Sequence, residues 1–145
     1  MINAEKFTEA LAYDMFDKGY TRNSLAEKLG VNRSNVTKYL SGNVFPDLPT
    51  FINLCVAFGC SADYLAGLRD DKPHVKIKGA NYSADRLRSV LNEFGVSQYR
   101  LQKDLKVSAS SVWAWLSGKA TPSVESLVKI AEYLDCSLDY ILGTE

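Results

Sequence analysis

The sequence predicts an all-α protein made of two tandem copies of one five-helix domain. Residues 8–68 align with residues 84–144 at a constant offset of 76 without a gap, and 16 of the 61 aligned positions are identical. Chance would give only a few identities. Within each copy, apolar residues recur at helical spacing between capping residues and glycines, and no strand is expected. We therefore expect two small domains, residues 1–68 and 84–145, joined by a linker of residues 69–83.

The first copy contains five capping residues, each followed by apolar residues at helical spacing. In chain order, the predicted caps are Asn3, Thr21, Asn32, Asp47 and Ser61. The first four helices stop at Gly19, Gly30, Gly42 and Gly59, and the fifth runs through Leu65. The residues expected to face the core are, helix by helix, Phe7, Leu11 and Met15; Leu25 and Leu29; Val36 and Leu40; and Phe51, Leu54, Cys55 and Phe58.

The second copy repeats this scheme with a serine at every cap. Its predicted caps are Ser83, Ser97, Ser108, Ser123 and Ser137, and its predicted stops include Gly95, Gly118 and Gly143. Lys106 stands where the first copy has the Gly30 stop. Between the copies, the segment His74–Lys78 alternates polar and apolar residues after a charge cluster and Pro73. This segment is expected to be a partly ordered linker; the alternative is one short strand, which would need a pairing partner.

The second and third predicted helices of each copy are joined by a turn of about four residues, which is the helix-turn-helix arrangement. The segments Leu25–Gly42 and Leu101–Gly118, the prolines that follow them and the closing Cys-Ser-x-Asp-Tyr segments resemble the lambda-repressor-like family (Cro/repressor, Xre type). This resemblance covers nearly all of the chain outside the linker. It implies that the third helix of each copy is a recognition helix in the DNA major groove, and that the start of the second helix grips phosphate.

The third helix of the first copy separates into a polar and an apolar face. At about 100° per residue, the polar residues fall within an arc of about 140°. Arg33 can bond in a bidentate manner to guanine, Lys38 can reach the same acceptors, and the Thr37 methyl group can contact thymine. The predicted base contacts are Asn32, Arg33, Ser34, Thr37 and Lys38, and the predicted phosphate contacts are Thr21, Arg22 and Asn43. A polar face is also ordinary for any exposed helix, so the helix-turn-helix context is what favours DNA.

The second copy departs from this pattern on the expected reading face. Ala109, Trp113 and Ala114 stand opposite Arg33, Thr37 and Lys38, so hydrogen-bonding groups are lost. Trp115 matches the inward-facing Tyr39 and is expected in the core, whereas Trp113 is expected to be exposed for a protein contact or for packing on DNA. The candidate DNA or protein contacts of this copy are Gln98, Ser108, Ser110, Ser111, Trp113 and Lys119. We predict that the first copy specifies the DNA sequence and the second supplies dimerisation or weak backbone contact.

Other chemistry is not expected. Cys55, Cys60 and Cys136 form no CxxC pair and are interpreted as reduced core residues. His74 is the single histidine, and the sequence has no phosphate-cradling or dinucleotide-binding glycine motif. Asp63 and Asp139 each lie two residues after a cap serine, where a negative charge favours a helix start. We therefore expect no metal site, no cofactor and no enzymatic activity.

The composition first argues against a nucleic-acid ligand. The 145 residues include 17 basic and 17 acidic side chains, a net charge of zero, whereas phosphate binding depends on Lys and Arg. However, Thr21–Phe45 and Ser97–Thr121 each carry four basic residues and one acidic residue, a local charge of +3. This distribution suits DNA binding at a local surface. No apolar stretch approaches the roughly 20 residues that span a membrane, and no signal peptide is visible, so the protein is expected in the cytoplasm without membrane contact.

These observations predict a sequence-specific DNA-binding transcriptional regulator. The resemblance implies a repressor of bacterial or phage type that binds double-stranded DNA. On a palindromic site, either the linker lets the two copies of one chain act as a pseudo-dimer, or two chains associate and present two first domains. The weak reading face of the second copy favours the homodimer. The alternative is a protein-interaction module, such as an anti-repressor or antitoxin-like adaptor, on the same scaffold. The neutral total charge and the face of Ala109, Trp113 and Ala114 favour the alternative. Arg22, Arg33 and Lys38 together favour DNA.

Overall fold

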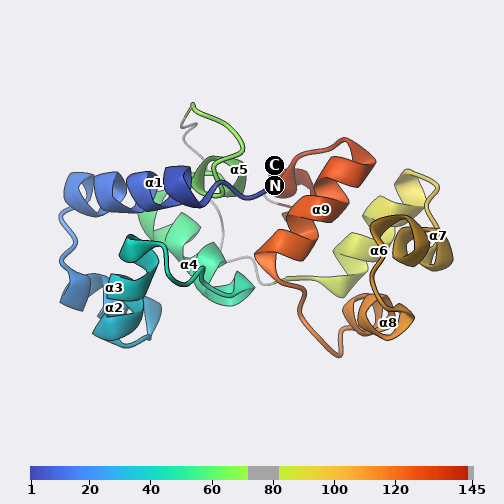
Figure 1. The fold of residues 1–145 in the computed structure, drawn as a ribbon, viewed down its shortest axis with the longest axis horizontal. Coiled ribbons are helices and arrows are strands. Elements are labelled where there is room, and N and C mark those ends of the chain that lie inside the picture. The colour runs from blue at the N-terminus through green and yellow to red at the C-terminus, as the bar shows by residue number, and fades with distance from the viewer. Residues whose placement is uncertain (72–81, 144–145) are drawn as a thin grey trace. The chain divides into compact units, whose positions relative to one another are not determined.

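The computed structural model describes residues 1–71 and 82–143, which form ten helices and no strand (Figure 1). The predicted all-α fold class is confirmed. The helices divide into two compact units of five helices each, which we call the first and the second domain. The segment His74–Lys78, which is expected to be a linker with a short strand as the alternative, lies outside the described residues.

The first domain contains five helices with the predicted order and punctuation. They are α1 (Ala4–Asp17), α2 (Arg22–Leu29), α3 (Arg33–Ser41), α4 (Leu48–Phe58) and α5 (Ala62–Leu65). Four of the five predicted caps accept a hydrogen bond from the amide of the third helical residue, and Thr21 and Ser24 form a reciprocal capping box. Asn32 is the exception: it occupies the N-cap position of α3, but its side chain makes no capping bond. The amide of Asn35 donates instead to the main-chain oxygen of Asn32, at 3.0 Å.

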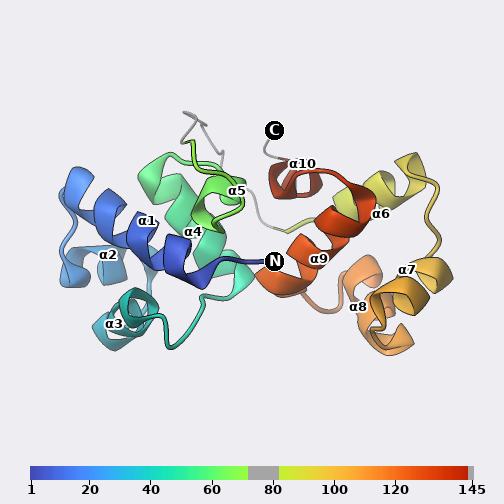
Figure 2. The ribbon, with the colours of Figure 1, turned by 45° about the horizontal axis from the view of Figure 1, so that its top comes forward.

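The core of the first domain fixes α3 by its apolar side. Val36 is 0% exposed and Tyr39 6% exposed, whereas the predicted core residue Leu40 is only half-buried, because α3 turns positions 36 and 39 to the core. The Phe45 ring, in the loop after α3, lies 4.6 Å from the Phe7 ring and 5.8 Å from the Phe51 ring, centroid to centroid. These contacts anchor the loop, and α3 lies at the edge of the domain away from α5 in both views (Figures 1 and 2).

The second domain contains α6 (Ala84–Glu93), α7 (Gln98–Leu105), α8 (Ala109–Ser117), α9 (Val124–Leu134) and α10 (Leu138–Leu142). All five predicted serine caps accept a hydrogen bond from the amide of the third helical residue. Lys106 ends α7 in the left-handed conformation, and Asp135, which the sequence did not single out, ends α9 in the same way.

The second core differs from the expectation for Trp115. Trp115 is half-buried and not fully in the core, and Val112 is the buried residue of α8. Since α8 packs against α6 and α7 mainly through Val112, the larger Trp115 ring remains at the edge of the core. Cys55 and Cys60 are buried as expected, Cys136 is only half-buried, and none of the three forms a disulfide.

Candidate nucleic-acid interface

The outward face of α3 carries all five residues predicted to contact bases. Asn32, at the start of the helix, and Arg33, Ser34, Thr37 and Lys38 are all exposed. The opposite side is held in the core by Val36 and Tyr39. Burial raises the pKa of the Tyr39 phenol, with a further contribution from the Asp47 carboxylate that a hydrogen bond with Thr50 partly offsets. Tyr39 therefore stays neutral and packs as an apolar ring, while the polar side chains face solvent.

The side chains of this face are available to an external partner. Within the part of the chain that the structure describes, the side chains of Arg33, Thr37 and Lys38 make no hydrogen bond or ion pair. Cations elsewhere are engaged: Lys6 Nζ lies 2.7 Å from Asp70 Oδ1, and the Arg86 guanidinium donates to the main-chain oxygen of Tyr140 at 2.7 Å. The exposed cations of α3 can therefore bind without breaking an internal contact.

The predicted phosphate contacts lie at two places beside α3. Thr21 and Arg22 stand at the start of α2, and Asn43 follows the end of α3; all three are exposed. The Thr21 hydroxyl oxygen already accepts a hydrogen bond from the Ser24 amide at 3.0 Å. Thr21 is therefore less available for a phosphate than the sequence predicts. Arg22 places a guanidinium group at the start of α2, where the amides of a first helical turn are favourable for a phosphate.

The corresponding face of α8 is chemically different. Ala109 and Ser110 are exposed, and 49% of the Trp113 surface is exposed. The Ser108 hydroxyl oxygen accepts from the Ser111 amide at 3.1 Å, and Ser108 Oγ lies 2.7 Å from Ser111 Oγ and 3.2 Å from Ser110 Oγ. The three hydroxyl groups predicted as contacts are therefore engaged with one another at the helix start.

Comparison with known proteins identifies this architecture. The model of the helix-turn-helix family, of Cro/C1 type, matches residues 17–65 and 87–141, one segment in each domain. The chain belongs to this helix-turn-helix family. One relative is the SPbeta prophage-derived uncharacterized HTH-type transcriptional regulator YonR of Bacillus subtilis (strain 168), which is 37% identical over 59 residues, or 41% of this chain. The chain spans about half (55%) of the length of that relative. No solved structure matches the chain.

The helix-turn-helix of the second domain has a cation over its exposed tryptophan. Lys119 Nζ lies 5.4 Å from the centroid of the Trp113 ring, within the range of a cation–π contact. Gln98 is exposed at the first position of α7 and lines a hollow of about 250 Å³ with Arg88, Ser97 and Leu116 among others. The predicted contacts Trp113 and Lys119 are thus brought together, whereas Gln98 lies at the start of a different helix.

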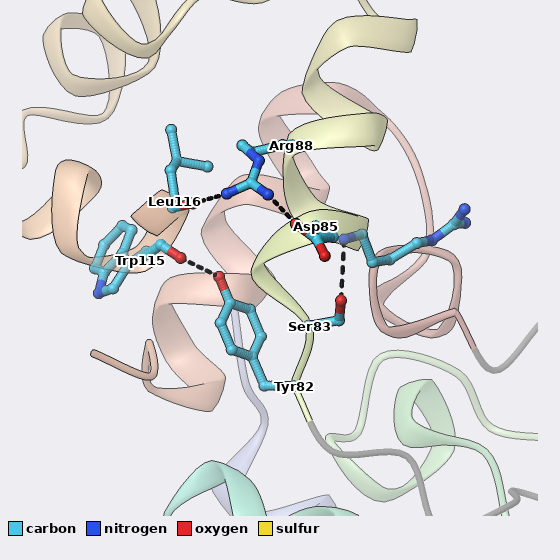
Figure 3. A network of polar contacts seen from close by, with 7 residues as sticks. Tyr82, Ser83, Asp85, Arg88, Trp115 and Leu116 are labelled. Atoms are coloured by element: carbon cyan, nitrogen blue, oxygen red, sulfur yellow. Dashed lines mark hydrogen bonds and ion pairs between the residues drawn. The ribbon is translucent and has the colours of Figure 1, made fainter. Parts of the chain in front are cut away.

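Two residues that the sequence did not indicate hold the end of α8 (Figure 3). Tyr82 Oη donates a hydrogen bond of 2.8 Å to the main-chain oxygen of Trp115. The Arg88 guanidinium donates to the main-chain oxygen of Leu116 and pairs with the Asp85 carboxylate. Burial raises the pKa of Tyr82 to about 12, so its hydroxyl keeps the donated proton at neutral pH. No sequence pattern could have revealed these bonds, because the acceptors are main-chain carbonyls 33 and 28 residues away.

Neither a metal centre nor a membrane helix is found in the described ranges. In residues 1–71 and 82–143, no three His, Cys, Asp or Glu side chains are grouped as a metal ion would require. Over the same residues, no helix combines the length and the apolar character that crossing a bilayer requires.

Proposed function

We propose that this protein is a sequence-specific DNA-binding transcriptional regulator whose first domain reads the operator. The observation that carries the proposal is the exposed and internally unengaged set of Arg33, Thr37 and Lys38 on a helix whose other side is fixed in the core. Membership of the helix-turn-helix family and the similarity to an HTH-type transcriptional regulator support it.

In the proposed mechanism, α3 lies in the major groove of double-stranded DNA. The planar fork of Arg33 would bond to guanine O6 and N7, Lys38 would reach neighbouring acceptors, and the Thr37 methyl group would contact a thymine methyl group. Asn32 is suited to a base or phosphate contact because its side chain is not used as a cap. Arg22 would fix the register through phosphate. The role needs no catalytic step and no cofactor.

We further propose that the protein acts as a homodimeric repressor in the cytoplasm. Two copies would present two first domains to a palindromic site, with their α3 helices separated by about 34–36 Å or a multiple of it. A bound dimer would then prevent access to the DNA that it covers.

The first test is selection of bound sequences from a random duplex pool, followed by the same selection with Arg33→Ala. We expect a defined motif for the wild type, and loss of preference at one base pair of each half-site with Arg33→Ala, at a cost of about 1–3 kcal/mol for that pair. Lys129→Ala is the matched control, because Lys129 is an exposed cation on α9 of the second domain and is not part of the helix-turn-helix segment of either domain. An unchanged motif and affinity with Arg33→Ala would contradict the proposal.

The second candidate function is a protein-interaction module. The observation that favours it is the large exposed surface of Trp113 beside Ala109 and Ser110. Salt dependence separates the two candidates, because binding to DNA releases counterions and weakens steeply as salt rises. If the wild type is not retained on duplex DNA at about 50 mM salt, the DNA-binding proposal is abandoned in favour of the protein partner.

A further inference from the structure

We propose that the second domain binds the sugar-phosphate backbone of the same DNA through the outward face of α8, without reading bases, and that Tyr82 and Arg88 position α8 for this contact. The inference rests on the proposed function, since it assigns a second contact to the same duplex. It concerns a surface defined by Trp113 and Lys119, together with the bonds that hold the end of α8.

Charge complementarity favours DNA as the occupant of this surface. The segment Ser97–Thr121 has a net charge of +3, and its four basic residues are all exposed: Arg100, Lys103, Lys106 and Lys119. Its single acidic residue, Asp104, is engaged within the domain, because it accepts a hydrogen bond of 2.5 Å from Tyr133 Oη and lies 3.7 Å from Arg100 Nε. The helix α8 itself carries no charged residue. The surface therefore attracts a polyanion, and the one carboxylate of its segment is already engaged by Tyr133 and Arg100.

The side chains of α8 are better suited to contact the sugar-phosphate backbone of DNA than to read its bases. Ala109 and Ala114 cannot donate or accept, and the Ser108 hydroxyl is occupied at the helix cap. Trp113 stands where α3 has Thr37, and its larger ring would keep α8 farther from the base edges. The indole N–H can donate to a phosphate oxygen, the ring can pack on a sugar, and Lys119 adds a positive charge beside it. Such contacts are the same for every base pair.

The end of α8 is held by side chains from outside the helix, whereas at the end of α3 the Gly42 amide donates to the main-chain oxygen of Tyr39, at 3.2 Å. The last four carbonyl groups of a helix have no partner within that helix. In α8, Tyr82 and Arg88 supply donors to two of them (Figure 3). The equivalent positions of the first domain are Lys6 and Ala12; Ala12 has no donor, and Lys6 is paired with Asp70. Because α8 lacks the base contacts that would orient it in the groove, these internal bonds fix its direction before DNA arrives, which lowers the ordering cost of binding.

The contact is tested on the full chain with two duplexes of equal length, the selected operator and its scrambled sequence. Lys119→Gln is expected to weaken binding to both by the same factor, about 3- to 10-fold, and to reduce the slope of log affinity against log salt by about one. Trp113→Ala is expected to weaken both equally. Lys129→Gln is the control, because it removes an exposed lysine from α9 of the same domain and should leave affinity and slope unchanged.

The positioning role is tested with Tyr82→Phe, which removes only the hydroxyl group. Both tryptophans of the chain, Trp113 and Trp115, lie on α8, so tryptophan emission reports on this helix alone. We expect a red shift of the emission and an equal loss of affinity for both duplexes. Tyr140→Phe is the control: it removes a hydroxyl that donates to the Glu93 carboxylate in the same domain, and it should change neither reading.

The outcomes separate this inference from the function on which it rests. Unchanged binding by both Lys119→Gln and Trp113→Ala would overturn the α8 contact and leave that surface to a protein partner. An altered ratio between operator and scrambled duplex would overturn it by showing base readout. Wild-type emission and affinity in Tyr82→Phe would overturn the positioning role. If the wild type binds neither duplex, the proposed function falls together with the inference.

Discussion

Gly67 is the glycine at which an added Cβ would meet the closest neighbouring atoms. It follows α5 with φ +78°, and a Cβ at this position would lie 2.7 Å from Asn3 Cβ and 2.9 Å from the Asn3 main-chain oxygen. The equivalent Gly143 has φ +74°, but the nearest atoms to its Cβ would belong to the Arg86 side chain, at 3.6–3.8 Å. The two glycines share a conformation and differ in available space.

This pair gives a prediction about stability. Both alanine substitutions place a Cβ in the left-handed region, which costs about 1–2 kcal/mol. Gly67→Ala adds an overlap with main chain that cannot move easily, worth about 1–3 kcal/mol more. Urea unfolding followed by circular dichroism should therefore show a larger loss for Gly67→Ala than for Gly143→Ala. Equal losses would mean that α1 and the end of α5 separate readily at this contact.

Individual residues also show how far the sequence predicts a candidate interface. The exposure of Arg33, Thr37 and Lys38 followed from helical periodicity alone, because Val36 fixes which side of α3 is buried. Their contacts with DNA remain predictions. Tyr82 could not be found in the same way, since its partner is a main-chain oxygen and no side-chain pattern marks a carbonyl.

Among the elements, the two copies differ most clearly in the residues that end their helices. The first domain ends α2 and α4 with glycines in the left-handed conformation, whereas the second ends α7 with Lys106 at φ 56° and α9 with Asp135 at φ 55°. Non-glycine residues are uncommon in this region. The sequence predicted the stop at Lys106 through its alignment with Gly30. The same alignment places Asp135 opposite Gly59, but Asp135 was not among the predicted stops.

The charges of these two stops predict opposite side effects of substitution by glycine. Each change stabilises the folded state by relieving about 1–2 kcal/mol of backbone strain. Each also lowers stability by about 0.4–1 kcal/mol, because glycine raises the conformational entropy of the unfolded chain. The carboxylate of Asp135 stands at the negative end of α9, so its removal adds about 0.3–1 kcal/mol of stability, whereas Lys106→Gly loses a favourable charge of similar size. Asp135→Gly should therefore raise the midpoint of thermal unfolding more than Lys106→Gly does. The reverse order would contradict the helix-dipole argument.

At the scale of the whole molecule, the charge distribution explains why a neutral protein can bind DNA. The two segments with a charge of +3 contain the two helix-turn-helix pairs, and the remaining residues compensate them. Total charge therefore gave a misleading first indication, and only counting along the chain corrected it. With few cations in each segment, we expect weak non-specific binding. We also expect affinity to depend on the proposed base contacts of α3 and on the number of domains that engage the duplex.

Equivalent core substitutions test this division of labour between the domains. Leu25 and Leu101 occupy the same position of the repeat and are both 0% exposed, so Leu25→Ala and Leu101→Ala should each cost about 2–5 kcal/mol in their own domain. For domains of this size, that loss is a large part of the total stability. Because both tryptophans lie on α8, Leu101→Ala should lower the midpoint of thermal unfolding followed by tryptophan emission, and Leu25→Ala should leave this midpoint unchanged while lowering the one followed by circular dichroism.

The same two variants should differ in DNA binding, measured at a temperature between the two midpoints of each protein. With its first domain unfolded, Leu25→Ala loses discrimination between operator and scrambled duplex. With its second domain unfolded, Leu101→Ala binds both duplexes more weakly and by the same factor, since α8 contributes no base contact. Equal shifts of the tryptophan-monitored transition in both variants would show that the two domains unfold as one cooperative unit, and the separate roles could then not be assigned to separately folded parts of the chain.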